Sequence, residues 1–197
     1  MEIFLARHLE VDIDVSRFCI GQTDVLLSRK AKSRLAQFSE ELKSLHPEAL
    51  ISSDLVRCKD IAEKVAEDTG IFLKTDPLWR EVNFGEWENR AWNDLWQSDH
   101  DRVDHWMQNF VSAVPPGGES YMMLFQRIHA QLDRLADRTE KRILVVTHAG
   151  VIRSAISFVL GMPLERSFSL EIKFGCLTGL RCEDGRWSLF SLRNPLE

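Results

Sequence analysis

Two runs that are typical of buried strands, far apart in the chain, each end at a histidine. Residues 3–6 are all apolar and lead directly into Arg7 and His8, and the run 142–147 leads into His148. Short runs of this composition favour buried strands. In open α/β sheets the functional groups gather at the carboxyl ends of the strands. The two runs therefore predict an α/β fold in which both histidines lie at the same edge of one sheet.

Segments with helical periodicity separate the strand-like runs. We expect Ser28 to cap the first helix, and Ser53 or Asp54 to cap the second. Pro47 and Gly70 are the corresponding stop signals. The later expected helices are one or two short ones over 91–111, a long one that begins at residue 120, and a nearly all-apolar one over 151–160. The last of these is predicted to be buried because it has no polar face.

Shorter segments with strand character complete the pattern. They are residues 49–52, 72–74, 167–173, 177–182 and 187–192, with a hairpin turn at Asp184 and Gly185. Strands that alternate with helices and finish in a hairpin are typical of a mixed, mostly parallel sheet. We therefore predict a three-layer α/β/α fold with a small helical cap insertion, and a single domain over residues 1–197.

Composition and charge limit the classes of function. With 44% hydrophobic and 28% charged residues the chain is typical of a folded globular protein. A net charge of −5 argues against nucleic acid as a partner. The sequence has no segment of membrane-spanning length and begins with a strand rather than a secretion signal, so we expect a cytoplasmic protein without membrane contacts. Monomer and homo-oligomer both stay open.

The four cysteines are scattered along the chain. They are Cys19, Cys58, Cys176 and Cys182. None of them forms the close pair that a zinc site or a redox motif needs. We expect free thiols, as in a protein of a reducing compartment.

Five side chains suited to phosphate chemistry fall at strand ends, at a helix start or in an irregular segment. Arg7, His8 and His148 end the two runs, Arg57 lies in the first turn of the expected second helix, and Glu81 lies in an aromatic-rich irregular segment. Two arginines and two histidines repel one another unless an anion neutralises them, and a phosphate dianion suits that charge. A neutral imidazole can also attack phosphorus. The set predicts phosphoryl chemistry that needs no metal and no other cofactor.

Five segments, in this order, resemble the motifs of the histidine phosphatase superfamily, which also contains the cofactor-dependent phosphoglycerate mutases. They are Leu5-Ala6-Arg7-His8, residues 52–57, residues 78–88, Gly118-Glu119-Ser120 and residues 146–153. Their spacing spans almost the whole chain. The resemblance implies a phosphoglycerate mutase-like fold and a small-molecule phosphate ester as the substrate.

The resemblance also implies roles for individual residues. His8 is the nucleophile that becomes phosphorylated, and Glu81 donates a proton to the leaving oxygen. The residues expected to hold the substrate phosphate are Arg7, Arg57, His148, Gln22 and Thr23. Three other acids compete for the role of proton donor: Glu86, Glu88 and Glu119.

Within the superfamily, the loop 18–27 and the segment 80–88 most resemble the α-ribazole phosphatases, which remove the 5′-phosphate during assembly of the cobalamin lower ligand. The implied substrate is α-ribazole 5′-phosphate or adenosylcobalamin 5′-phosphate. Leu9 stands where many mutases have glycine, which argues against a glycolytic mutase. Two alternatives stay open: a phosphatase of wider range, and a phosphate-binding regulatory module without turnover. Asp14, near the position of a phosphate-contacting asparagine in many relatives, keeps the second alternative open.

Five of the six tryptophans lie between Trp79 and Trp106. One interpretation is an aromatic wall that stacks on a benzimidazole ring. Irregular segments also use tryptophan simply for packing, and we favour that role for most of these side chains.

Overall fold

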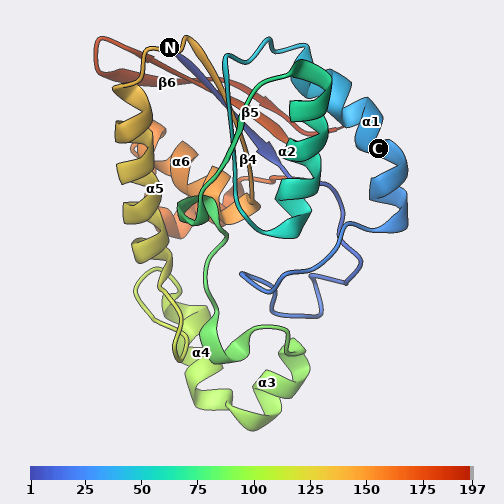
Figure 1. Cartoon of the computed structure of the whole chain (residues 1–197). Coiled ribbons are helices and arrows are strands. Elements are labelled where there is room, and N and C mark those ends of the chain that lie inside the picture. The colour runs from blue at the N-terminus through green and yellow to red at the C-terminus, as the bar shows by residue number, and fades with distance from the viewer. Residues whose placement is uncertain (196–197) are drawn as a thin grey trace.

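A six-stranded sheet forms the centre of the molecule (Figure 1). The computed structural model describes residues 1–195, and its strand order is β3-β2-β4-β1-β5-β6. The strands are β1 (Glu2–Arg7), β2 (Ala49–Ser52), β3 (Leu73–Thr75), β4 (Arg142–Thr147), β5 (Leu177–Glu183) and β6 (Arg186–Arg193). The pairs β1/β4, β2/β4 and β2/β3 are parallel, whereas β1/β5 and β5/β6 are antiparallel. The predicted mixed, mostly parallel sheet is confirmed.

The register of the central strands brings their carboxyl ends together. Arg7 of β1 lies opposite Thr147 of β4. His8 and His148, which follow these residues, therefore leave the sheet at the same edge. On the other side of β4, Ser52 at the end of β2 lies opposite Val146. The helix that follows β2 thus begins at this edge as well.

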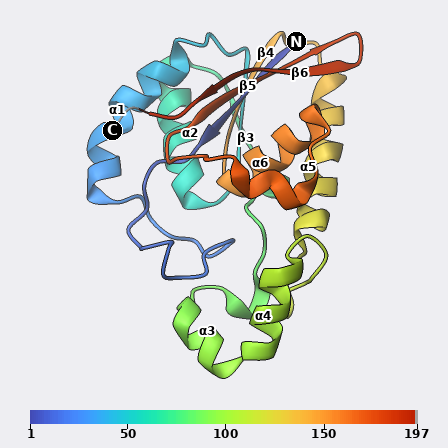
Figure 2. The ribbon, with the colours of Figure 1, turned by 180° about the vertical axis from the view of Figure 1, so that it is seen from behind.

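Helices cover both faces of the sheet (Figures 1 and 2). They are α1 (Arg29–Lys43) and α2 (Val56–Thr69), which pack together on one face, and α5 (Tyr121–Ala136) and α6 (Ala149–Leu160), which pack together on the other. The three-layer arrangement predicted from the sequence is confirmed. Within residues 1–195 no helix is long and apolar enough to cross a membrane.

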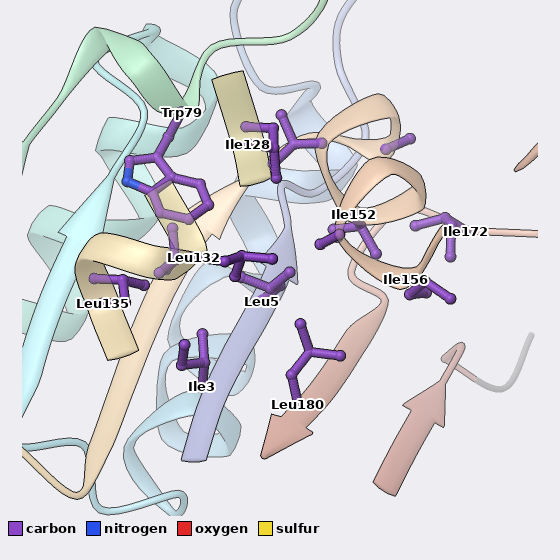
Figure 3. Packing of buried hydrophobic residues seen from close by; sticks show 14 of the residues in the cluster. Ile3, Leu5, Trp79, Ile128, Leu132, Leu135, Ile152, Ile156, Ile172 and Leu180 are labelled. Atoms are coloured by element: carbon purple, nitrogen blue, oxygen red, sulfur yellow. The ribbon is translucent and has the colours of Figure 1, made fainter. Parts of the chain in front are cut away.

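Alternate side chains of β1 fill two separate cores, as the period of two in a strand requires. Ile3 and Leu5 belong to the core under α5 and α6, whereas Phe4 and Ala6 belong to the core under α1 and α2. Figure 3 shows the first core, in which β1 meets side chains of both helices: Ile128, Leu132, Ile152 and Ile156. Because β1 is buried on both faces, the position of His8 at its end is firmly fixed.

Two short helices form a cap beyond the carboxyl end of the parallel strands, at the bottom of Figures 1 and 2. They are α3 (Trp92–Ser98) and α4 (His100–Asn109). The cap has a small core of its own, made of Cys19, Trp87, Leu95 and Val103. The packing role expected for most tryptophans is confirmed for Trp79 and Trp87, each 1% exposed.

The cap expected for the first helix and the helix start expected at Ser120 are confirmed, and the cap expected for the second helix is wrong. The Ser28 hydroxyl accepts a hydrogen bond from the backbone N–H of Ala31 at 3.1 Å. The Ser120 hydroxyl accepts one from the backbone N–H of Met123 at 3.2 Å. The N-cap of α2 is Leu55, which offers no side-chain cap. Asp54 instead pairs with Arg80, and the Ser53 hydroxyl contacts a histidine of the site described below. Both polar side chains are thus engaged at the edge of the sheet.

The strand predicted over 167–173 is also wrong. Residues Leu164–Ser169 form a short 3-10 helix, η3, and the chain continues without regular structure to β5. Leu164 and Ser167 are both buried, which is the period of three that a 3-10 helix requires. The backbone carbonyls of Leu170 and Ile172 do not pair with a neighbouring strand, because they accept hydrogen bonds from the side chains of Arg153 and Arg7.

Candidate active site

The carboxyl edge of the sheet brings His8 and His148 together. Their ring centroids lie 5.2 Å apart, with the rings inclined at 65°. Both histidines are buried, with 5% and 0% exposure. Arg57, the second residue of α2, reaches the same point and is 2% exposed, which excludes a solvated role for this side chain.

Hydrogen bonds fix which nitrogen of His8 faces the site. Nδ1 lies 2.7 Å from the carbonyl oxygen of Leu9 and must donate to it, since a carbonyl can only accept. In the neutral ring, Nε2 then carries the lone pair, and it has no hydrogen-bond partner within residues 1–195. Burial, followed by the charges of Arg57 and Arg7, lowers the pKa of His8 well below its ordinary value. His8 therefore presents an unprotonated Nε2 at neutral pH.

His148 is held in the opposite tautomer. Nε of Arg57 donates to Nδ1 of His148 at 3.3 Å, so Nε2 of His148 carries the proton and donates it to the Ser53 hydroxyl at 2.9 Å. Burial, followed by the charges of Arg57 and His8, lowers the pKa of His148 well below its ordinary value. His148 is thus a neutral hydrogen-bond donor whose orientation depends on Arg57.

Arg57 also ties a loop to the site. Its Nη1 donates to the carbonyl of Thr23 at 2.8 Å, and its Nη2 donates to the carbonyl of Gly21 at 2.5 Å. Burial lowers its pKa. Since all three nitrogens of the guanidinium have protein partners, Arg57 connects the loop before α1 rigidly to His148.

Arg7 is held from one side and has a donor to spare. Its Nη1 donates to the carbonyl of Ile172, and its guanidinium carbon lies 3.9 Å from the centroid of the Phe174 ring. Its Nε is buried without a hydrogen-bond partner. Burial lowers the pKa of Arg7 to about 10, with Glu81 acting in the opposite direction, so the side chain stays charged at neutral pH. A buried donor without a partner is costly, and an anionic oxygen beside it removes that cost.

The carboxylate of Glu81 lies against the first turn of α6, the helix that directly follows His148 in the chain. Its carboxylate accepts hydrogen bonds from the backbone N–H of Val82 and of Gly150, both at 3.0 Å. A Cβ on Gly150 would lie 2.2 Å from Glu81 Oε1, so only glycine leaves room for this carboxylate. Glu81 also lines a cavity of about 120 Å³ whose walls are largely aromatic: Phe84, Trp106, Tyr121 and Phe168.

The competing acids are engaged elsewhere. Glu88 accepts from the backbone N–H groups of residues 21–23, and Glu119 pairs with Arg127 and accepts from the backbone N–H of Asn83. Glu86 is exposed. Of the four acids considered from the sequence, Glu81 is the one that lines this cavity, and its charge acts on Arg7.

The structure places the loop residues Gln22 and Thr23 near the site but in contact with protein groups. Nε2 of Gln22 donates to the carbonyl of Glu81 at 3.1 Å, and the Thr23 hydroxyl donates to Glu88 at 2.5 Å. Their role as phosphate ligands stays a prediction. Asp14 is exposed and accepts hydrogen bonds from Ser16, which lower its pKa.

Three residues contribute to the site in roles that were not predicted from the sequence. Gly150 makes room for Glu81, Glu88 organises the loop that Arg57 clamps, and Phe174 stacks on Arg7. Gly150 and Glu88 both lie within the motifs quoted from the sequence, and this was the available signal for them. Phe174 directly follows the segment 167–173 that was wrongly predicted as a strand, so no pattern pointed to it.

Acidification is expected to destabilise the fold through the two buried histidines. Their pKa values lie near 6.5 in the unfolded chain and well below that value in the folded protein. Below about pH 6.5 the unfolded chain therefore binds more protons, and the free energy of unfolding falls by up to about 1.4 kcal/mol per pH unit for each histidine. Denaturant titrations between about pH 7 and pH 5 measure this slope. The variant His8→Asn should show a smaller slope than the wild-type protein, and an equal slope would contradict the assignment.

The model of the histidine phosphatase superfamily (branch 1) matches residues 3–195 of this chain. The match spans the sheet, both helical layers, the cap and the five residues Arg7, His8, Arg57, Glu81 and His148. The chain belongs to the histidine phosphatase superfamily, as its motifs indicated. It is accordingly a phosphatase, which is a hydrolase.

Relatives with assigned names agree with this family. Adenosylcobalamin/alpha-ribazole phosphatase of Escherichia coli (strain K12) is 26% identical over 181 residues, which cover 91% of this chain and 89% of the relative. Probable phosphoglycerate mutase GpmB of Salmonella paratyphi C (strain RKS4594) is 28% identical over 192 residues, which cover 95% of this chain and 87% of the relative. Both matches extend over nearly the whole chain, so the likeness is not confined to the site motifs.

Solved structures show the same fold. The alpha-ribazole phosphatase from Shigella flexneri matches with a TM-score of 0.91 at 26% identity, covering 98% of this chain and 96% of that chain. The mycobacterial glucosyl-3-phosphoglycerate phosphatase matches with a TM-score of 0.84 at 24% identity, covering 96% of each chain. The first includes the cap as well as the sheet within its coverage, and the second is a likeness of fold alone. The phosphoglycerate mutase-like fold implied by the motifs is confirmed.

Proposed function

We propose that the protein hydrolyses a small-molecule phosphate monoester through a phosphohistidine at His8. The observation that carries this proposal is the state of His8, whose Nε2 is unprotonated, unpartnered within residues 1–195 and surrounded by Arg7, Arg57 and His148. Two guanidinium groups supply the positive charge that a transferring phosphoryl group needs, so the chemistry requires no metal.

The reaction has two steps that share the same groups. Nε2 of His8 attacks phosphorus, the bond from phosphorus to the leaving oxygen breaks, and Glu81, as the general acid, gives a proton to that oxygen. A water molecule then attacks the phosphohistidine and loses a proton to the Glu81 carboxylate, which frees His8 and inorganic phosphate. Arg7, through its unpartnered Nε, and Arg57, through the second hydrogen on each terminal nitrogen, contact the non-bridging oxygens in both steps. His148 joins them when its Nε2–H turns from the Ser53 hydroxyl to the phosphate. Gln22 and Thr23 are proposed to contact the phosphate after exchange of their present partners.

The proposed substrate is α-ribazole 5′-phosphate or adenosylcobalamin 5′-phosphate. Two observations support it: the likeness to the α-ribazole phosphatases of Escherichia coli and Shigella flexneri, and the four aromatic side chains that line the cavity at Glu81. A leaving group with a flat apolar ring system can stack between Phe84, Trp106 and Phe168, whereas a polyhydroxylated sugar gains less from such walls.

Phosphate release from α-ribazole 5′-phosphate tests the proposal, measured beside a panel of sugar, nucleotide and glycerate phosphates in excess chelator. The expected result is a higher kcat/KM for α-ribazole 5′-phosphate that persists in chelator and is lost in His8→Ala. Equal or better turnover of other esters would overturn the substrate and leave a phosphatase of wider range. Phosphoglycerate isomerisation without release would indicate a mutase, and no reaction with any ester would indicate a binding module.

A further inference from the structure

A second and larger hollow adjoins the site at Arg7. It has a volume of about 820 Å³ and shares Arg7 and Phe174 with the phosphate site. Five of its nine lining residues are cationic, and one, Glu171, is acidic. The chain as a whole carries a net charge of −5, so this concentration of positive charge runs against the overall balance.

Three of the cations around the hollow lack acidic partners. Lys30 and Arg34, on the first turns of α1, take part in no ion pair or side-chain hydrogen bond within residues 1–195. Arg153, on α6, makes a single hydrogen bond, from Nε to the carbonyl of Leu170 at 3.1 Å. Unpaired like charges around one hollow repel each other, and a bound anion relieves that repulsion.

Arg153 connects the hollow to the chemistry. It lines the large hollow and also the aromatic cavity that contains Glu81. Its guanidinium is held in place by Leu170 and by the Phe168 ring, 5.0 Å from the ring centroid, while both terminal nitrogens are without partners within residues 1–195. Arg153 is therefore a fixed cation that borders both the cavity at Glu81 and the large hollow.

We propose that this hollow is a subsite for a second anionic group, a phosphate or a carboxylate, on the same molecule that is dephosphorylated at His8. Arg153 and Arg34 are the main contacts, and Lys30 adds charge. The inference rests on the proposed phosphatase chemistry and deepens its specificity. A substrate with a single phosphate, such as α-ribazole 5′-phosphate, leaves the subsite empty, so molecules with two separated anions are expected to bind more tightly.

Binding of stable phosphonates tests the subsite without any turnover. The probes are alkane-1,ω-bisphosphonates with two, three or four carbons and the alkylphosphonates of matching length, titrated calorimetrically into the wild-type protein. Work at an ionic strength of about 0.15 M restricts charge effects to roughly 8 Å. At least one bisphosphonate is expected to bind about tenfold or more tightly than its matched monophosphonate, as two charge-assisted hydrogen bonds allow. Equal affinities at every length would overturn the proposal.

Variants on α1 locate the effect. The double variant Lys30→Gln/Arg34→Gln is expected to reduce the ratio of the two affinities by about tenfold, while monophosphonate binding stays unchanged. Lys32→Gln removes one charge from the same exposed stretch of α1 but does not line the hollow, and it should leave the ratio as it is. An unchanged ratio in the double variant would contradict the subsite. Monophosphonate binding that fails throughout would instead count against the phosphate site at His8.

Discussion

Replacing His8 with asparagine is expected to reduce kcat on the order of 10⁵-fold or more, the scale observed when a nucleophile is removed from another covalent enzyme. Asparagine retains a group that can donate to the carbonyl of Leu9, so the backbone around residue 8 is expected to stay in place. It offers no nitrogen lone pair that can attack phosphorus. Steady-state phosphate release measures the loss.

The control is His105→Asn, which changes an exposed histidine on the cap helix α4. This variant should keep wild-type kcat. A His8→Asn protein that unfolds cooperatively and still turns over within tenfold of the wild-type rate would show that another group performs the attack.

Replacing Glu81 with glutamine is expected to lower kcat by about 10²–10⁴-fold on an alkyl phosphate, the usual contribution of a positioned acid. The effect should be much smaller on 4-nitrophenyl phosphate, because its leaving group departs without a proton. Glutamine fits the same space and its oxygen can still accept a hydrogen bond from Gly150, but the Val82 N–H loses its acceptor. Since that loss affects both substrates alike, the comparison between them isolates proton transfer. The ratio of kcat values on the two substrates is the measurement.

Glu86→Gln is the matched control for this prediction, since Glu86 is an exposed acid five residues further along the chain. It should leave both rates unchanged. If Glu81→Gln lowered both rates equally, Glu81 would act in positioning rather than as the acid. If it lowered neither, the leaving oxygen would receive its proton from another group.

Local patterns predicted most of the fold, because they record contacts between neighbours in the chain. The strand 49–52, the cap Ser28 and the helix start at Ser120 follow from short-range rules, and all three are found in the structure. The stretch 167–173 looked equally regular in the sequence. It does not form a strand, because arginines from β1 and α6 take up its backbone carbonyls. Those partners are remote in sequence, so no local pattern could reveal them.

The candidate site, like the fold, could be predicted from the sequence only in part. Arg7, His8 and His148 follow from the ends of two strands, but the sequence offered four acids for one role. Only the folded arrangement separates Glu81, which lines the cavity, from Glu88, which binds the loop that precedes α1. The tautomers of the two histidines likewise depend on a carbonyl, a hydroxyl and a guanidinium that the fold brings together.

The proposed mechanism depends above all on a covalent phosphohistidine at His8. The direct measurement is rapid quenching of the enzyme with base during turnover of a radiolabelled phosphate ester, followed by peptide mapping of the bound label. Base preserves a phosphorus–nitrogen bond long enough for mapping. The mechanism predicts that the label is bound to the peptide that contains His8 and that it forms at least as fast as phosphate is released. It predicts no bound label in His8→Asn. Steady turnover with no bound label, or with label on His148, would contradict it.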